Sequence, residues 1–338
     1  MVIGCVLKNW LGDVVFASPA IRVIRNNFPT AELICFAPER CVEVLAVNPH
    51  VDRVIPFDER GLHKGFWGKL KLIGTLRRLH LDRVYLFHHS FTRALVVYLG
   101  GVKERIGFAT KGRSFLLTQP ITEPAQKMHS VDLALELLKR SGLPVATDAL
   151  YEFYFDKSDL ERVKRFIRKE PLGFGRLVAV HPGANWTYKR WPWEKFRDLT
   201  KELVRRYRVN VVVTGGVGDR ELAEKIVKSA SDPRIISLCG ATKLRELGAL
   251  FSLCALVVSS DSGPLHIAGG VGTNVVGIFG PTDPTVTGPR GRGRNIVIHY
   301  VPEGEQVPWL GKHFPKEGWM ERISVEEVLH TIEREKLL

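Results

Sequence analysis

The chain has 338 residues, of which 45% are hydrophobic and 25% are charged, and its formal net charge is +13 at pH 7. This length exceeds one ordinary hydrophobic core and the composition is globular, so we expect two folded domains rather than a disordered chain. The apolar runs are far shorter than the roughly 20 residues of a membrane span, and residues 1–7 lack the features of a signal peptide. We therefore expect a cytoplasmic protein.

The excess of positive charge would attract an acidic partner: nucleic acid, an anionic membrane surface or a phosphorylated substrate. The basic residues concentrate between Lys64 and Arg113, with few acids among them. A solvated helix face explains this cluster equally well. Nucleic acid is not expected, because neither an aromatic-basic RNA-binding pattern nor a recognition-helix motif is present.

The five cysteines are an odd number without CxxC spacing. In a cytoplasmic protein we expect them to stay reduced, including Cys5 and Cys35 on neighbouring predicted strands. Neither a disulfide nor a metal site is predicted.

Strands and helices alternate along the first half of the chain. The pattern predicts strands at 2–7, 32–37, 54–57, 83–87 and 104–107, and helices at 14–27, 42–47, 65–79, 92–99 and 131–141. Such alternation requires parallel strands joined by crossover helices.

The alternation restarts in the second half, after a charged helix at 157–170. Here we predict strands at 177–181, 209–214, 235–238, 255–259, 275–279 and 295–299, and helices at 193–207, 219–229, 244–253, from 264, and at 325–335. The sequence thus predicts an α/β protein of two Rossmann-like, doubly wound domains, 1–156 and 157–338, facing across a cleft. Ligands should bind in the loops that follow the strands.

The segment Ser-Asp-Ser-Gly-Pro-Leu-His at 260–266 follows an apolar strand and opens a helix. Gly263 permits close backbone approach, and the N–H groups of a helix start present positive charge to a phosphate. Asp261 stands at the strand tip and His266 one turn into the helix. In the alternative interpretation, Asp261 or Ser262 only caps the helix and His266 is packed.

The loop at 181–192 also favours a phosphate, because Thr187 can donate a hydroxyl hydrogen bond and Lys189 a compact positive charge. A surface loop without function is the alternative. The next glycine-rich turn is at 214–219. Asp219 at its end, or Glu221 just after it, could bind ribose hydroxyls, or Asp219 could simply cap its helix. The Gly- and Pro-containing loop at 280–289 is expected to shape the cleft.

In the first half, Asn-Trp-Leu-Gly-Asp at 9–13 follows the first strand and puts Asp13 at the start of the next helix. A helix N-terminus favours an ionised carboxylate, which suits both a cap and a general base. The local context by itself favours the cap.

At these motifs the sequence resembles the ADP-heptose:lipopolysaccharide heptosyltransferases, glycosyltransferases of the GT-B fold. The opening at 9–13 is more similar to heptosyltransferase II than to heptosyltransferase I. The second type often has a cysteine-rich stretch before the final helix, however, which residues 303–322 lack. The resemblance runs through Asn9–Asp13, Ser18-Pro19-Ala20, Asn48-Pro49, Arg105-Ile106-Gly107-Phe108, His181-Pro182-Gly183-Ala184, Lys189-Arg190-Trp191-Pro192, Gly215-Gly216, Asp261–His266 and Phe279–Pro284.

The resemblance implies that the first domain receives a Kdo-containing lipid A core and that the second binds ADP-heptose. Asp13 matches the family's catalytic base, Lys189 its diphosphate-binding lysine and Asp261 its donor-sugar carboxylate. A terminal helix at 325–335 would cross back to the first domain. Further donor contacts are expected at Thr187, Asp219, Thr242, Leu244, Ser262, Gly263 and His266, and acceptor contacts at Asn9, Lys64, Arg93 and Arg105.

One base and one stabilised leaving group point to direct displacement with inversion, and without a DxD motif we expect no metal or other cofactor. The protein would act as a monomer at the anionic inner face of the inner membrane. Three alternatives remain: heptosyltransferase I, another GT-B sugar-nucleotide enzyme such as an epimerase, and a non-enzymatic protein that binds anionic polymers.

Overall fold

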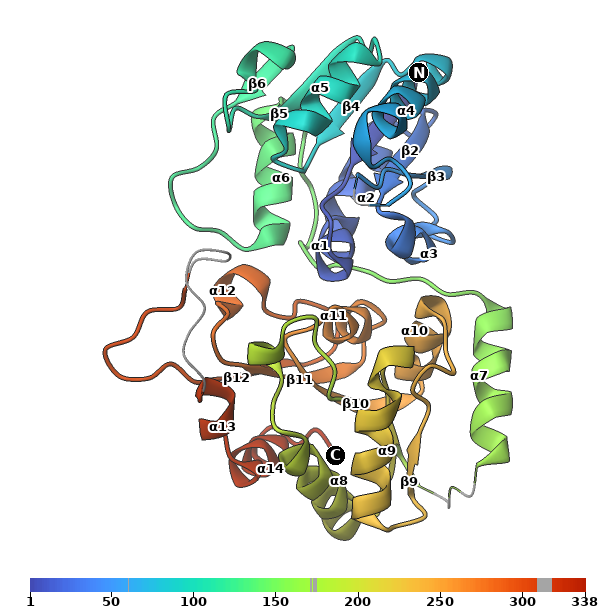
Figure 1. The fold of residues 1–338 in the computed structure, drawn as a ribbon, viewed down its shortest axis with the longest axis vertical. Helices are drawn as coiled ribbons and strands as arrows, with labels where there is room; N and C mark the ends of the chain where they lie inside the picture. Colours follow the sequence, from blue (N-terminus) through green and yellow to red (C-terminus); the bar gives the residue numbers. More distant parts are fainter. Residues whose placement is uncertain (60, 171, 173–174, 309–317) are drawn as a thin grey trace. The chain divides into compact units, whose positions relative to one another are not determined.

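The computed structural model describes the chain apart from residues 60, 171, 173–174 and 309–317 (Figure 1). The chain divides into two compact units, Met1–Phe153 and Tyr154–Leu338. Each unit is built on its own parallel sheet of six strands. The α/β class with two doubly wound sheets is therefore confirmed.

The first sheet has the strand order β3-β2-β1-β4-β5-β6, and its register places Cys5 opposite Cys35. Its strands are β1 (Val2–Val6), β2 (Glu32–Ala37), β3 (Arg53–Pro56), β4 (Arg83–Leu86), β5 (Glu104–Phe108) and β6 (Gln119–Ile121). Its helices are α1 (Leu11–Phe16), α2 (Ser18–Asn27), α3 (Val42–Leu45), α4 (Gly65–Leu79), α5 (Phe91–Leu99) and α6 (Ser130–Arg140), with 3₁₀ turns η1 (Glu39–Cys41) and η2 (Ser114–Leu116).

The second sheet repeats this order as β12-β11-β10-β7-β8-β9. Its strands are β7 (Leu177–His181), β8 (Asn210–Val213), β9 (Ile235–Ser237), β10 (Cys254–Ser260), β11 (Asn274–Phe279) and β12 (Asn295–His299). Its helices are α7 (Lys157–Lys169), α8 (Trp193–Tyr207), α9 (Arg220–Ala230), α10 (Leu244–Ser252), α11 (Gly263–Gly270), α12 (Pro284–Thr287), α13 (Trp319–Arg322) and α14 (Val325–Arg334), with 3₁₀ turns η3 (Thr187–Lys189) and η4 (Val217–Asp219).

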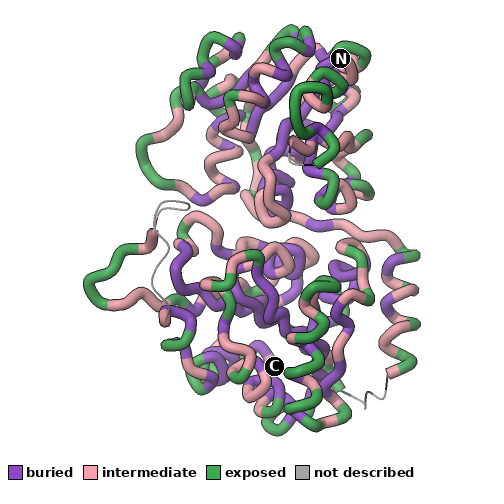
Figure 2. The backbone as a smooth tube through the Cα atoms, viewed as in Figure 1, coloured by how far each residue is buried: buried purple, intermediate pink, exposed green. Residues whose placement is uncertain are grey.

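The central strands are buried along nearly their whole length instead of alternating between buried and exposed residues. In β10 six of the seven residues are buried, and in β8 all four are. Parallel strands covered by helices on both faces show this pattern, because neither face meets water. Figure 2 shows the result as buried tube running through the middle of each unit. None of the helices in the described ranges has the length and apolar character needed to cross a bilayer.

The predicted helix at 14–27 is in fact two helices, α1 and α2, which meet at Ala17. Pro19 lies in the first turn of α2, where its missing N–H is tolerated, but it could not continue α1. The Ser18 hydroxyl donates to the Val15 carbonyl at 2.8 Å and so satisfies part of the end of α1. Because of this break, Asp13 lies in a short separate helix that follows the carboxyl end of β1.

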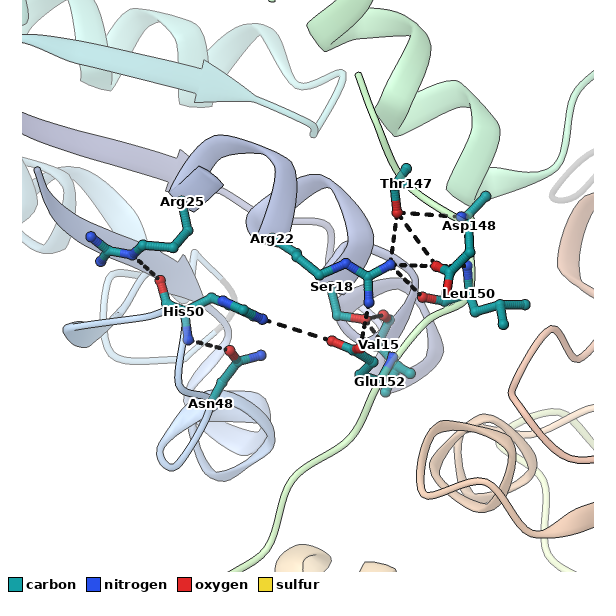
Figure 3. Close-up of polar contacts among 11 residues, drawn as sticks. Val15, Ser18, Arg22, Arg25, Asn48, His50, Thr147, Asp148, Leu150 and Glu152 are labelled. Carbon is teal, nitrogen blue, oxygen red and sulfur yellow. Dashed lines mark hydrogen bonds and ion pairs between the residues drawn. The ribbon is translucent and has the colours of Figure 1, made fainter. Parts of the chain in front are cut away.

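The last segment of the first unit is tied to α2 by a polar network (Figure 3). The Arg22 guanidinium binds the Glu152 carboxylate and also Asp148 Oδ1 at 2.5 Å and Thr147 Oγ1 at 2.7 Å. The backbone N–H of Glu152 donates to Ser18 Oγ at 2.8 Å. Ser18 therefore has a structural role: it anchors the segment around Glu152, just before the chain enters the second unit.

The terminal helix α14 is part of the core of the second unit. Its apolar residues Val328, Leu329 and Ile332 are fully buried in the core of the second unit, and α14 packs against α8. Because this face is used inside the second unit, α14 is a core element there, and its expected packing on the first domain stays a prediction.

Candidate active site

Each sheet has a point at which the strand order reverses. In the second sheet β7 and β10 are neighbours, although β8 and β9 lie between them in the sequence. In the first sheet β1 and β4 are neighbours in the same way. Open α/β sheets bind ligands beyond the carboxyl ends of such strands. The loops after these four strands are therefore the candidate sites.

A buried ion pair joins the two loops of the second unit. Lys189 Nζ lies 2.5 Å from Asp261 Oδ2, and His266 Nε2 lies 3.8 Å from the other oxygen, Oδ1. Burial would raise the pKa of Asp261, but the His266 hydrogen bond and the Lys189 charge outweigh it and lower the pKa to about 2. Asp261 is thus ionised at neutral pH, so it can accept hydrogen bonds from hydroxyl groups but cannot act as a proton donor.

The lysine loop is held to the sheet by its backbone and by a tryptophan. The N–H of Trp191 donates to Ser260 Oγ at 3.2 Å, which connects the loop to the end of β10. The Trp191 indole is 2% exposed and donates to the Ile323 carbonyl at 3.0 Å. Lys189 Nζ lies 4.8 Å from the centroid of the Trp186 ring. The ammonium position is therefore set before any ligand binds.

The start of α11 is open toward the same place. Ser262 occupies the N-cap position, but its hydroxyl lies 2.9 Å from the Ser259 hydroxyl and does not cap the helix. Pro264 takes an early helical position, where no N–H is needed. Gly263, the first helical residue, has no side chain to cover the helix end. These features leave the partial positive charge of the helix end available to an anion.

Asp219 does not cap α9 in the usual way. Its Oδ2 accepts a hydrogen bond from the Gly216 N–H at 2.9 Å. A Cβ at Gly183 or Gly215 would meet the Asp219 side chain at 2.9 and 2.7 Å, so both glycines are needed for this close packing. Glu221, the alternative ribose ligand, is exposed in the first turn of α9.

The other expected donor contacts also lie in loops after strands. Thr187 is exposed in η3, two residues before Lys189. Thr242 and Leu244 are partly exposed where the chain passes from β9 into α10. These positions border the same carboxyl edge of the sheet, because β7, β8 and β9 are adjacent and parallel.

Thr282 is a residue that the sequence reasoning missed. It follows β11, the neighbour of β10, and is 4% exposed. No group within the described ranges forms a hydrogen bond with Thr282 Oγ1. Buried hydroxyls normally have a partner, so this one is a candidate for binding a ligand. The only sequence signal was its place in a Gly-Pro loop after a strand.

In the first unit, Asp13 lies in the first turn of α1, three positions after the N-cap residue Trp10. It is therefore not the N-cap that its local sequence favoured. The Asp13 side chain is 20% exposed, and its Oδ1 lies 3.8 Å from Lys8 Nζ. A carboxylate that is partly exposed and not used as a cap remains available as a base.

Asn9 precedes Asp13 and is fixed by two neighbours. Its Nδ2 lies 3.1 Å from His88 Nε2, at the end of β4, and its Oδ1 accepts from Arg93 Nη2 at 2.6 Å. Arg93 is 1% exposed and also binds Glu59 and the Leu7 carbonyl. Because its guanidinium is occupied by protein oxygens, Arg93 orients Asn9, and the expected direct acceptor contact is not supported.

Two further acceptor residues were expected. Lys64 is exposed just before α4 and follows the carboxyl end of β3, as expected. Arg105 instead lies near the amino end of β5, where it donates to the Leu116 carbonyl at 2.7 Å. Since β4 and β5 are parallel, this end is opposite to the candidate site. This position does not support the expected acceptor contact of Arg105.

Arg113 is a second buried arginine near the carboxyl end of the first sheet. It donates to the Phe108 carbonyl at 2.9 Å and to the His88 carbonyl at 2.5 Å. Within the part of the chain that the structure describes, its Nη2 and His89 Nε2 have no hydrogen-bond partner. Burial lowers the pKa of His89 to about 4, helped by the charges of Lys8 and Arg113, so this imidazole is neutral at pH 7.

A family model described as glycosyltransferase family 9 (heptosyltransferase) matches residues 69–308, well over half of the chain. The chain belongs to this family. The resemblance drawn from the motifs is confirmed, and the protein is a glycosyltransferase.

Relatives in family 9 match the chain over nearly its whole length. Lipopolysaccharide heptosyltransferase 2 of Escherichia coli K12 is 24% identical over 90% of this chain and 90% of its own. Lipopolysaccharide heptosyltransferase 3 of the same strain is 26% identical over 96% of this chain and 94% of its own. The solved structure of E. coli ADP-heptose lps heptosyltransferase II has a TM-score of 0.77 and 25% identity, covering 99% of this chain and 98% of that one. The expected GT-B type of fold is thereby confirmed.

Proposed function

We propose that this family 9 enzyme transfers L-glycero-D-manno-heptose from ADP-heptose to the heptose/Kdo-lipid A inner core, as a heptosyltransferase of the second type. The named relatives support the substrates: one is a heptosyltransferase 2 and one solved structure is an ADP-heptose enzyme. Within this chain, the observation that carries the proposal is the Lys189–Asp261–His266 cluster beside the open start of α11.

The donor is bound by the second unit. Lys189 and the N–H groups at the start of α11 contact the diphosphate, where opposite charge and helix dipole act together. Asp261, which is ionised at neutral pH, accepts hydrogen bonds from heptose hydroxyls, and the Thr282 hydroxyl forms a further hydrogen bond with the heptose. Asp219 or Glu221 binds the ribose, with Thr242 and Leu244 beside the adenine.

The reaction is a single displacement. The acceptor oxygen attacks the anomeric carbon, and the bond from this carbon to the β-phosphate oxygen breaks with its electron pair going to ADP. Asp13 takes the proton of the acceptor hydroxyl. One displacement inverts the anomeric configuration. Lys189 stabilises the charge that develops on the leaving ADP, a kind of contribution worth about 3–4 kcal/mol in other enzymes.

The acceptor is bound by the first unit, through Asn9 and Lys64, with Arg113 and His89 added to the expected set. The Kdo carboxylates and core phosphates would be attracted by the positive charges of Lys64 and Arg113. The enzyme acts as a cytoplasmic monomer at the anionic inner face of the inner membrane and needs no cofactor.

The test uses the purified protein with ADP-heptose and heptosyl-Kdo-lipid A. We expect ADP release only when the acceptor is present, and a product heavier by one heptosyl residue whose anomeric configuration, read by NMR, is inverted. Transfer to an acceptor that lacks the first heptose would indicate the first type. Isomerised sugar nucleotide without any acceptor would contradict the proposal in favour of an epimerase.

A further inference from the structure

Large apolar side chains are exposed very unevenly in this protein. Among the described residues, nine of the large hydrophobic side chains that are exposed belong to the first unit and two to the second. Eight of the nine come from segments that follow β3, β4 and β5. Six of these eight lie before or in the first two turns of α4, at the start of α5, or in η2. We call these six the aromatic rim: Leu62, Phe66, Trp67, Leu70, Phe91 and Phe115.

The rim contains two pairs of neighbouring aromatic rings, carried by elements that pack together. Trp67 is 80% exposed, Phe66 68% and Phe115 72%. The Phe66 and Trp67 rings are in edge contact at 5.5 Å, and the Phe91 and Phe115 rings lie 6.1 Å apart. Helix α4 packs against α5 (Figure 1), and α5 packs against η2. Single exposed apolar residues are normal, but a group on adjoining elements marks an interaction surface.

The rim is built into the fold at a fixed place. Crossover helices begin at the carboxyl ends of parallel strands, so the first turns of α4 and α5 lie at the edge that carries the acceptor loops. The chain before α4 is fixed there by Glu59, which binds Arg93, which in turn binds Asn9. Gly68 lies so close to the backbone of His63 that a Cβ would approach it at 2.5 Å. Exposure of Phe66 and Trp67 is therefore not the result of a loose helix.

The positive charge next to the rim favours an anionic partner. Helix α4 contains Lys69, Lys71, Arg77 and Arg78 but no acidic residue. At helical spacing, Lys71 follows Trp67 by one turn, so the exposed face is apolar in its first turns and cationic further on. A second copy of a chain with net charge +13 would be repelled, whereas anionic lipid headgroups would be attracted. Aromatic rings next to lysines are typical of elements that lie in the headgroup region of a bilayer.

We propose that the aromatic rim docks this enzyme on an anionic lipid bilayer, with the first turns of α4 inserted among the headgroups. The aromatic rim would be the part of the protein that contacts the membrane. The biological purpose of this contact rests on the proposed function. A lipid-linked acceptor could then stay in the bilayer while its sugars reach the loops after β1 and β4.

The test is vesicle co-sedimentation without donor or acceptor, so it does not depend on whether heptose is transferred. The vesicles contain roughly three parts phosphatidylethanolamine to one part phosphatidylglycerol, and phosphatidylcholine vesicles serve as the neutral comparison. We expect binding to the anionic vesicles that weakens with salt. The variant F66S/W67S/L70S should bind at least about tenfold more weakly. The matched control V217S/L253S removes the two exposed apolar residues of the second unit and should bind like the wild type.

Two further measurements make the result decisive. Trp67→Ser alone changes a side chain that is 80% exposed, so it should keep the fold and still lose about fivefold or more in binding. Turnover of the triple variant should fall with acceptor embedded in vesicles and stay unchanged with a deacylated, water-soluble acceptor. Wild-type binding by the folded triple variant would overturn the proposal. So would vesicle binding that requires the acceptor, or a dimer in solution that the triple substitution dissolves.

Discussion

Replacing Lys189 with methionine tests the donor site most directly. Methionine keeps the length of the side chain but removes the ammonium that lies 2.5 Å from Asp261 Oδ2. In the proposed reaction this charge stabilises the departing ADP. Loss of one such preorganised group elsewhere costs about 2.7–4 kcal/mol, so kcat/KM should fall about 10²–10³-fold.

The same substitution should also lower stability. The Lys189 side chain is 15% exposed and that of Asp261 7%, so the variant leaves a buried carboxylate with only His266 near Oδ1. Breaking a buried pair typically costs about 3–5 kcal/mol. Because His266 remains and the pKa of Asp261 can rise, we expect about 1–3 kcal/mol, or a Tm lower by roughly 2–12 °C.

ADP release is measured over a range of donor concentrations with the acceptor saturating. The matched control is Lys225→Met, which removes an ammonium 3.9 Å from the centroid of the Trp193 ring in the same unit. This control should change kcat/KM less than about twofold, as substitutions away from a site usually do. Near-native kcat/KM in folded Lys189→Met would refute the role of Lys189. An equal loss in Lys225→Met would show that the effect is not specific to the site.

Asp13→Asn should lower kcat by about 10²–10⁴ while the Kd for ADP-heptose, measured by calorimetry, stays unchanged; full turnover at saturating substrates would exclude the base. The pKa of Asp261 is lowered from 3.8 to about 2 in the folded protein, so the ionised carboxylate adds about 2 kcal/mol to the free energy of unfolding. This stabilisation is fully present above pH 3.8 and is lost as the pH falls toward 2. The stability difference between wild type and Asp261→Asn, from urea unfolding, should therefore shrink over that range, whereas the exposed Asp198→Asn should differ little at any pH. Glu152→Gln removes the charge that pairs with Arg22 and should lower the free energy of unfolding of the first unit by about 1–2 kcal/mol, seen as a lower urea midpoint. An unchanged midpoint would contradict the anchoring role.

The sequence by itself was sufficient for the architecture. The strand β10 is almost entirely apolar, and strand–helix alternation allows only a parallel sheet with helices on both faces. The loops at 181–192 and 260–266 were also recognisable, because glycine, proline and polar residues directly follow apolar strands. These are local properties, and local sequence encodes them.

Only the tertiary structure decided which loop residues meet. Lys189 and Asp261 are 72 residues apart and pair because β7 and β10 are neighbours, which depends on strand order and not on either loop. The position of Arg105, in contrast, could be read from the predicted strand at 104–107, because it lies near the amino end of that strand. Arg105 and Arg113 look alike in the sequence, but one lies at the amino end of its strand and the other is buried beyond the carboxyl end. The apolar stripe of α14 could have packed on either half, and only the tertiary structure shows that it packs against α8.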